Sequence, residues 1–437
     1  RSASVSWGSE MCIRDRYQAV LNGVTIITGG PGTGKTTTIN TILQVFEQEG
    51  LDILLAAPTG RAAKRMSETT GWEAQTIHRL LEINGGVSEG DTQGAMHFER
   101  NEKQPLEADV VIIDEFSMVD IYLMNALLRA IVPGTRLIIV GDVNQLPSVG
   151  PGNVLKDMIQ AEFCSVVRLH RIFRQAAESQ IVMNAHRINS GEEISLENAS
   201  PDFMHLERKD SASVINVVVQ LIMQKLPPHV DASPYDIQVL TPTRKGELGV
   251  EHLNQVLQQY MNPADAGKVE REFHGVLFRE KDKVMQIKND YQIRWTKKTS
   301  LGDVYEEGTG VFNGDTGIIR EIIPVAEQVV VEFEEGKMVE YEYSQMDEME
   351  LAYAITIHKS QGSEYPAIVL PVLGGPKMLL GRNLLYTAVT RAKKCVTTVG
   401  SSRVIQGMIH NVNEQKRFSS LCQRIKEMEE EDAELNH

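Results

Sequence analysis

The chain has 437 residues, which is too long for one compact core, so we expect two or three domains. Its 44 Lys and Arg residues against 59 Asp and Glu residues give a formal net charge of −15. That charge excludes a basic field over the whole protein but not a local basic track. No apolar run approaches the roughly 18 residues of a membrane helix. The four cysteines are far apart, which argues against a zinc site or a disulfide scaffold and fits a reducing cytoplasm.

The two ends of the chain differ from the globular sequence between them. Residues 1–16, RSASVSWGSEMCIRDR, have neither helical nor strand periodicity, and part of them resembles translated sequencing-adapter DNA. We expect this tail to be non-native, with a disordered tail as the alternative. Residues 427–437 form an acidic tail, and such a run is usually a solvated helix end or tail. Since the first residue is Arg, the sequence is expected to be a fragment.

A nucleotide-binding motif follows the first predicted strand. Residues 24–28 (VTIIT) predict that strand, residues 29–36 (GGPGTGKT) match G-x-x-x-x-G-K-T, and a helical pattern comes next. Glycines let backbone N–H groups turn toward phosphate oxygens, and the helix N-terminus adds partial positive charge. Lys35 is expected to reach the β and γ phosphates of ATP, and the Thr36 hydroxyl to bind Mg²⁺. The predicted nucleotide-binding residues are Gly29, Gly30, Pro31, Gly32, Thr33, Gly34, Lys35, Thr36 and Thr37.

Two later apolar strands end in side chains that nucleotide hydrolysis needs. The strand predicted at 110–113 ends in Asp114, expected to hold Mg²⁺, and Glu115, expected to polarise the attacking water as general base. The strand predicted at 137–140 is followed by Gln145, a candidate sensor of the γ-phosphate. Because strands alternate with helices, we expect a doubly wound parallel sheet with its ligand at the carboxyl ends of the strands.

Nine motifs in chain order resemble those of one family. They are GGPGTGKTT (29–37), APTGRAA (57–63), TIHRLL (76–81), IIDEFSMVD (112–120), GDVNQLPSVGPG (141–152), LHRIFRQ (169–175), LTPTRKG (240–246), AITIHKSQGSE (354–364) and LLYTAVTRAKK (384–394). The sequence resembles the RecD/TraA-type helicases of superfamily 1, the subgroup that moves 5′ to 3′, and within it the standalone RecD-like branch. The resemblance implies an α/β fold of two RecA-like P-loop lobes with ATP between them.

The resemblance also implies roles for residues outside the P-loop. The family's arginine fingers correspond to Arg174 and Arg391, and such an arginine neutralises charge on the transferring phosphoryl group. Glu364 corresponds to a nucleotide-contacting position. By themselves the two arginines would more often be surface ion-pair partners, Thr59 a helix cap, and His78 a partly buried structural histidine. The predicted DNA-binding residues are Thr59, Arg61, His78, Thr241, Arg244, Thr356 and His358.

A local basic track accompanies these motifs despite the acidic net charge. Contacts between basic side chains and the phosphates of a strand carry no sequence information. The basic residues that cluster around the motifs are Arg61, Lys64, Arg65, Arg79, Arg244, Lys245 and Lys359.

The expected domain division follows the motifs. Lobe 1 is assigned to residues 17–167, and lobe 2 to residues 168–272 and 351–426. In the family, residues 83–107 would hold a β-hairpin pin at the duplex fork, although a surface loop fits their weak periodicity equally well. Alternating apolar residues on both sides of Glu335-Gly336 predict a hairpin. Residues 273–350 are therefore assigned to an SH3-like β-barrel insertion, which either guides DNA or only braces the lobe.

We predict an ATP-dependent DNA helicase motor core, monomeric, acting on single-stranded DNA and duplex forks with recombination or repair proteins as partners. One alternative is a DNA-stimulated ATPase or translocase subunit that needs a missing domain or a complex to unwind. It is favoured because the family's N-terminal domain and adenine-reading glutamine motif are not found before Gly29. The other is a nucleic-acid-independent P-loop NTPase, against which the motifs of the second lobe argue.

Overall fold

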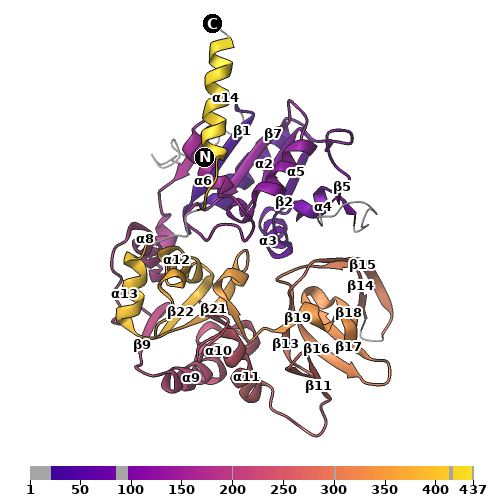
Figure 1. Ribbon diagram of the computed structural model, residues 1–437, viewed down its shortest axis with the longest axis vertical. Helices are drawn as coiled ribbons and strands as arrows, with labels where there is room; N and C mark the ends of the chain where they lie inside the picture. Colours follow the sequence, from indigo (N-terminus) through magenta and orange to yellow (C-terminus); the bar gives the residue numbers. More distant parts are fainter. Residues whose placement is uncertain (1–20, 85–96, 199, 300–301, 413–416, 436–437) are drawn as a thin grey trace, which may run out of the picture. The chain divides into compact units, whose positions relative to one another are not determined.

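The protein, seen here as a computed structural model, divides into two compact units. The structure describes residues 21–84, 97–198, 200–299, 302–412 and 417–435 (Figure 1). The first unit comprises Arg1–Val182 and Glu414–His437, and the second comprises Met183–Asn413. Among the helices in these ranges, none is long and apolar enough to cross a membrane.

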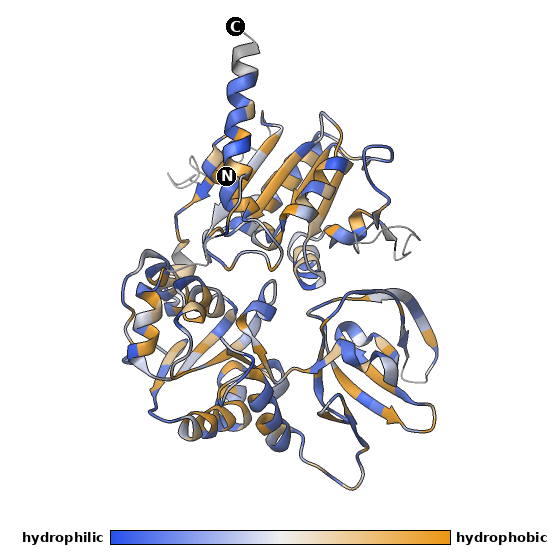
Figure 2. Cartoon of the chain, in the orientation of Figure 1, coloured by the Kyte–Doolittle hydropathy of each residue, from blue (hydrophilic) through white to orange (hydrophobic). Residues whose placement is uncertain are grey.

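The first unit is built on a parallel sheet of six strands in the order β3-β2-β6-β7-β1-β8. Its strands are short and apolar, which suits strands buried on both faces (Figure 2). Ile27 and Ile138 pack against helix α2 on one face, whereas Ile26 and Ile139 pack with residues of α5 and α6 on the other. The strands are Val24–Gly29 (β1), Ile53–Ala57 (β2), Ala74–Thr76 (β3), Val110–Ile113 (β6), Arg136–Gly141 (β7) and Ser165–Leu169 (β8), and the helices are Lys35–Gln48 (α2), Gly60–Thr70 (α3), Ile121–Ala130 (α5) and Val154–Ala161 (α6). The predicted doubly wound parallel sheet is confirmed.

The boundary expected between residues 167 and 168 falls inside β8. This strand pairs with β1 along its whole length and completes the first sheet, and the first unit continues to Val182. The chain also returns to the first unit after the second, through helix α14 (Leu421–Leu435), which packs on α6. Both ends of the expected lobe 2 are therefore corrected, and the acidic residues from 427 onward begin within a helix. Such non-local pairings leave no local signal in the sequence.

Two very short strands lie where the family's pin was expected. Strand β4 (Ile83–Asn84) pairs antiparallel with β5 (His97–Phe98), so the base of a hairpin is present. Residues 85–96, which would form its tip, lie outside the described residues. The pin itself stays a prediction.

The second unit contains a parallel sheet of five strands in the order β20-β10-β21-β22-β9. Its central strand β21 is buried over almost its whole length, as expected for a parallel strand covered on both faces. The strands are Phe203–Glu207 (β9), Gln238–Thr241 (β10), Ala354–Thr356 (β20), Tyr365–Val372 (β21) and Ala392–Gly400 (β22), and the helices include Gln180–Ser190 (α8), Ser211–Gln220 (α9), Val250–Met261 (α11), Arg382–Val389 (α12) and Ser402–His410 (α13).

An antiparallel module interrupts this second sheet between β10 and β20. Seven of its strands follow the order β15-β14-β18-β17-β16-β13-β19, and the predicted hairpin is confirmed because Val331 of β17 pairs with Val339 of β18. A separate pair, β11 and β12, precedes them, so the module begins three residues before the expected residue 273. The strands are Glu270–Phe273 (β11), Val276–Arg279 (β12), Lys283–Gln286 (β13), Asp290–Lys298 (β14), Val304–Val311 (β15), Thr316–Ile323 (β16), Gln328–Phe333 (β17), Met338–Glu342 (β18) and Met349–Leu351 (β19).

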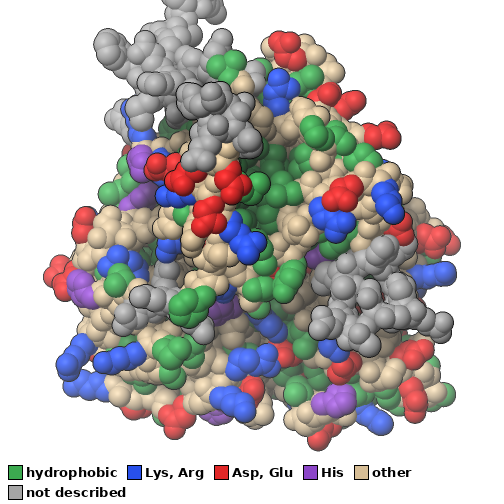
Figure 3. Space-filling model, turned by 45° about the horizontal axis from the view of Figure 1, so that its top comes forward, with side chains coloured by type: hydrophobic (Ala, Val, Ile, Leu, Met, Phe, Trp, Pro, Cys, Tyr) green, Lys and Arg blue, Asp and Glu red, His purple; other side chains and the backbone are tan. Residues whose placement is uncertain are grey.

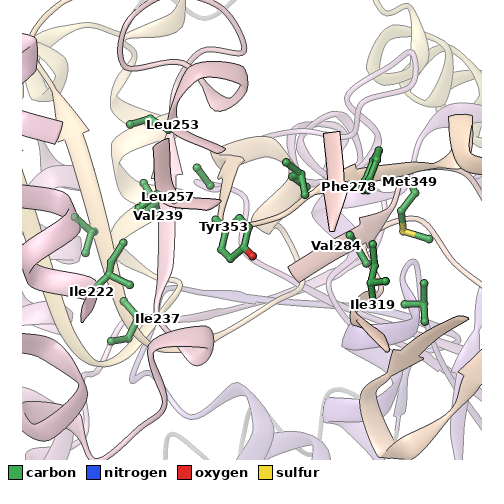
Figure 4. Close-up of a cluster of buried hydrophobic side chains, with 14 of the residues drawn as sticks. Ile222, Ile237, Val239, Leu253, Leu257, Phe278, Val284, Ile319, Met349 and Tyr353 are labelled. Atoms are coloured by element: carbon green, nitrogen blue, oxygen red, sulfur yellow. The ribbon is translucent and has the colours of Figure 1, made fainter. Parts of the chain in front are cut away.

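The module and the second parallel sheet share one hydrophobic core. In Figure 4, Val239 and Leu257 lie on the side of the sheet and its helices, Val284 and Ile319 lie on the side of the module, and Tyr353 lies between them. The Tyr353 hydroxyl donates to Asp282 at 2.9 Å. Because this core is continuous, the module is firmly part of the second unit.

Candidate nucleotide-binding site and basic track

The P-loop joins β1 to α2 with the backbone that its glycines permit. Gly32 and Gly34 have φ angles of 71° and 87°, in the left-handed region that other residues avoid, and Gly34 is the N-cap of α2. The Lys35 ammonium donates to the carbonyl oxygens of Gly29 (2.6 Å) and Gly30 (3.1 Å). The Thr33 hydroxyl also donates to Gly30, at 2.8 Å. The loop therefore holds a cation next to the helix N-terminus, as phosphate binding requires.

The chain after β8 packs directly on this loop. The Phe173 amide donates to the Gly32 carbonyl at 3.1 Å, and a Cβ added at Gly34 would clash with the Phe173 ring. A Cβ added at Gly32 would lie 2.7 Å from the Cβ of Ala176. Arg174 is the first residue of helix α7 (Arg174–Ala177), so its backbone lies in the segment that covers the P-loop. Both glycines are thus required by close approach as well as by their φ angles.

Asp114 and Glu115 follow β6, as predicted, and share an arginine. Asp114 accepts a hydrogen bond from the Glu115 amide at 2.7 Å, while the Arg65 guanidinium lies 2.8 Å from Glu115 Oε1 and 4.0 Å from Asp114 Oδ2. Burial, and then the charge of Glu115, raise the pKa of Asp114, whereas Arg65 and Lys35 oppose that rise. Arg65 was expected in the basic track, but it belongs to this acidic pair as well.

Gln145 lies in the loop that follows β7, the strand next to β1. It is 8% exposed, and among the described residues its Oε1 has no hydrogen-bond partner. A buried amide oxygen without a donor is costly, so it suits a site where a donor arrives with a ligand. Among the described residues, no group of three or more His, Cys, Asp or Glu side chains is arranged so that it could hold a metal ion by itself. Thr36 and Asp114 nevertheless offer the oxygen ligands that fit Mg²⁺, which is typically held by one or two carboxylates together with phosphates.

The DNA-binding candidates of the first unit also have structural roles. The Thr59 hydroxyl accepts from the Ala62 amide at 3.3 Å and caps α3, so the capping alternative is observed. Arg61 lies in the first turn of the same helix. His78, on the short helix α4 (Ile77–Leu80), is half-buried, and its ring centroid lies 6.1 Å from that of Phe98. Burial lowers the pKa of His78, while the charge of Asp120 opposes this, so a neutral imidazole is favoured near pH 7.

The candidates of the second unit meet at one edge of its sheet. β10 and β20 are parallel neighbours, so Thr241, Arg244, Thr356 and His358 lie at or just beyond their carboxyl ends. Thr241 is 1% exposed and its hydroxyl donates to the Leu248 carbonyl at 2.6 Å. Thr356 caps the 3-10 helix η6 (Ile357–Ser360), whereas Arg244 and His358 are exposed. Of these four side chains, the arginine and the histidine are the most accessible to a strand.

Arg391 and Glu364 lie together in the second unit. Arg391 is 2% exposed, and its guanidinium donates to the backbone carbonyl oxygens of Ser363 (3.2 Å) and Thr387 (3.3 Å). It therefore braces the backbone of the SQGSE motif. Glu364 is exposed, with its carboxylate 3.6 Å from the Lys393 ammonium. The assignment of both residues to nucleotide hydrolysis stays a prediction.

The surface charge is mixed on the face that Figure 3 shows. Lys and Arg side chains lie among Asp and Glu side chains there, as the net charge of −15 implies. Any basic track on this face is therefore made of separate cations with acidic neighbours.

Three protein families match the chain in order. They are an AAA domain at residues 15–151, the SH3 domain of ATP-dependent RecD-like DNA helicases at residues 253–333, and a UvrD-like helicase C-terminal domain at residues 351–399. In the second match, the SH3 domain coincides with α11 and the module up to the end of β17.

Individual relatives agree with these families. Over 402 residues the chain is 35% identical to the ATP-dependent RecD2 DNA helicase of Deinococcus radiodurans, a match that covers 92% of this chain and 50% of that protein. It is 30% identical over 437 residues to the RecBCD enzyme subunit RecD of Mycobacterium tuberculosis, and this match covers 90% of this chain and 69% of that protein. Its fold is similar to that of a Pif1 helicase from a structural study of DNA unwinding at forked dsDNA. The TM-score is 0.51 at 20% identity, and the match covers 99% of this chain and 98% of that one.

The site thus belongs to a P-loop NTPase of the AAA type, with ATP as its nucleotide. The chain belongs to the RecD-like DNA helicases of superfamily 1. It spans about half the length of the RecD2 helicase that it matches.

Proposed function

We propose that this chain is the motor core of an ATP-dependent DNA helicase that translocates 5′ to 3′ along single-stranded DNA. The observation that carries the proposal is the meeting of three features at the carboxyl edge of one parallel sheet. These are the Lys35 loop, the Asp114–Glu115 pair and the buried amide oxygen of Gln145, which has no partner within the described part of the chain. Phosphoryl transfer needs a phosphate cradle, a metal ligand and a group that orients water.

The residues of the first unit suggest a division of roles. Lys35 and the loop amides would bind the phosphates, and Thr36 and Asp114 would hold Mg²⁺. When bound, Mg²⁺ would neutralise charge on the β and γ phosphoryl oxygens. Glu115 would accept the proton of the attacking water, with its carboxylate held by Arg65 at 2.8 Å. Gln145 would orient that water through its buried side-chain amide.

The second unit would contribute the strand-binding surface. Arg244, Thr356 and His358 at the carboxyl edge of β10 and β20 offer cationic, hydroxyl and imidazole groups to a phosphate backbone. Contacts of this kind position a strand without reading its sequence. The 5′-to-3′ direction rests on the family resemblance. We further propose that the chain is monomeric and works in the cytoplasm beside recombination or repair proteins.

A second candidate function is a motor subunit that hydrolyses ATP and translocates but does not unwind on its own. One fact favours it: a relative that is 30% identical to this chain is named as a subunit of the RecBCD enzyme. Strand separation on 5′-tailed, 3′-tailed and blunt duplexes, measured beside translocation, distinguishes the two functions. Unwinding of the 5′-tailed duplex alone supports the helicase. Normal ATP hydrolysis and translocation with no unwinding would instead support the subunit.

A further inference from the structure

Three charged side chains from separate segments meet at the carboxyl edge of the second sheet. Arg244 follows β10, Lys359 lies in η6 after β20, and Glu350 lies on β19 of the antiparallel module. The Arg244 guanidinium is 2.6 Å from Glu350 Oε1, and the Lys359 ammonium is 2.8 Å from Glu350 Oε2. Each cation thus contacts a different oxygen, and one carboxylate bridges both.

These contacts border a small hollow of the surface. Arg244, Glu350, Thr356 and Lys359 line it, with Met285 and Leu351 among its apolar residues. The side chains of Glu350 and Lys359 are 25% and 24% exposed, so both remain within reach of solvent. Burial alone would raise the pKa of Glu350, but hydrogen bonds and charge from Lys359 and Arg244 hold it below the ordinary value. The carboxylate is therefore ionised at neutral pH.

A carboxylate in this position has the chemical pattern of a backbone phosphate. Both groups present two oxygens that share one negative charge, and both match the donor geometry of arginine. Arg244 and Lys359 are spaced so that one such group contacts the two of them at 2.6 and 2.8 Å. The same spacing would accept the two non-bridging oxygens of a phosphodiester.

We propose that Arg244 and Lys359 form a single phosphate-binding site for single-stranded nucleic acid, which Glu350 occupies as an internal phosphate mimic until a strand displaces it. The inference rests on the proposed function, because it takes the carboxyl edge of the second sheet as the strand-binding surface. It adds a residue from the antiparallel module to that surface. The module then takes part in strand binding by competing with the strand, besides bracing the sheet.

Displacement of a carboxylate has a distinctive salt dependence. Strand binding normally gains from counterions released when cations meet phosphates, with a slope of about −0.7 in log K against log salt for each contact on a single strand. When a strand displaces Glu350, the freed carboxylate attracts a cation from solution, and this uptake offsets part of the release from the strand. Glu350→Gln should therefore tighten binding at low salt about threefold or more, and steepen the slope by up to about 0.7.

The test uses the whole chain and a fluorescein-labelled oligothymidylate, with fluorescence anisotropy read at several NaCl concentrations. The matched control is Glu332→Gln, on β17, which removes one negative charge from the same module by breaking the ion pair with Arg320. We expect Glu350→Gln to bind more tightly and with a steeper slope, and Glu332→Gln to match the original chain. Thermal unfolding of both variants verifies that they are folded.

Two other results would overturn the inference. Weaker binding by Glu350→Gln would mean that the carboxylate only positions the two cations, and unchanged affinity and slope would mean that no strand reaches them. Lys359→Gln provides a second variant, and it should weaken binding and flatten the slope; unaltered binding would contradict the shared site. Failure of the original chain to bind the oligonucleotide at any salt concentration would instead count against the proposed function.

Discussion

The Arg65 guanidinium points toward the Asp114–Glu115 pair that follows β6. Arg65 lies on α3 directly after Lys64, yet its guanidinium contacts Glu115 at 2.8 Å and its side chain is only 26% exposed. Lys64, the preceding residue, instead lies 3.9 Å from Glu68 on the same helix. Two adjacent cations thus have different partners because the helix turns them to different sides.

Arg65→Gln should lower the rate of ATP hydrolysis about tenfold. A hydrogen bond to a charged group contributes roughly 1.5–3 kcal/mol, and without it the Glu115 carboxylate is free to leave its orientation. We expect kcat to fall while the KM for ATP stays nearly the same. Steady-state kinetics with Lys64→Gln as the control check this, and equal kcat values for Arg65→Gln and the original chain would exclude the positioning role.

Lys35→Ala should abolish ATP hydrolysis and leave strand binding largely intact. The ammonium lies in the P-loop, bonded to the carbonyl oxygens of Gly29 and Gly30, and the strand-binding candidates lie on other loops. Hydrolysis and oligonucleotide anisotropy on the same preparation measure both properties. Comparable losses of the two would show that the P-loop lysine serves the fold rather than the phosphates.

At the scale of elements, a buried carboxylate joins the module to the second sheet. Asp282 is fully buried and accepts hydrogen bonds from the side chains of Gln258 (2.6 Å), Asn262 (2.7 Å) and Tyr353 (2.9 Å), and from the Arg279 amide (2.7 Å). These donors come from α11 and its C-cap residue Asn262, from β12, and from the residue before β20. One side chain therefore fixes where three parts of the second unit meet.

Asp282→Ala should reduce the free energy of unfolding by about 3 kcal/mol or more, because it leaves several buried donors without an acceptor. Tyr353→Phe removes only one of these hydrogen bonds and should cost about 1 kcal/mol. Urea unfolding of both variants, followed by circular dichroism, measures the difference. Equal losses in the two variants would show that Asp282 is not the centre of the junction.

After the second unit, the chain returns to the first unit, and there the half-buried side chain of Arg417 makes several hydrogen bonds. The Arg417 guanidinium donates to the carbonyl oxygens of Ser148 (2.6 Å), Gly150 (2.7 Å) and Gly152 (2.8 Å), in the loop that follows Gln145. Arg417→Gln should lower the stability of the first unit by about 1–3 kcal/mol. Urea unfolding, followed with a spectroscopic probe attached to the first unit, measures this loss of stability. Arg424→Gln, on α14, is the control.

Elements that are specified by a short stretch of sequence could be predicted, and elements that depend on pairing with distant residues could not. The P-loop needs only residues 24–36, and the hairpin around Gly336 needs only its alternation and turn, so both were predicted correctly. By contrast, β8 joins the first sheet by pairing with β1, more than a hundred residues earlier. The partners of Arg65 and Arg417 are also distant in the sequence, 50 residues away for Arg65 and more than 260 residues away for Arg417. No periodicity near either arginine encodes the partner that it finds.

For the whole molecule, the acidic net charge and the proposed DNA binding are compatible because the charges are locally arranged. The formal charge is −15, yet Arg244 and Lys359 stand at one edge of the second sheet with a single carboxylate between them. Long-range attraction to DNA should therefore be weak, and affinity should depend on a few close phosphate contacts.

The measurement that tests the central claim most directly is ATP hydrolysis with and without single-stranded DNA, using protein that begins at residue 17. The P-loop lies in the first unit and the candidates at β10 and β20 lie in the second. Coupling between them predicts strong stimulation by DNA, which Lys35→Ala abolishes. Hydrolysis at the same rate with and without DNA would contradict the account and favour a P-loop NTPase that works independently of nucleic acid.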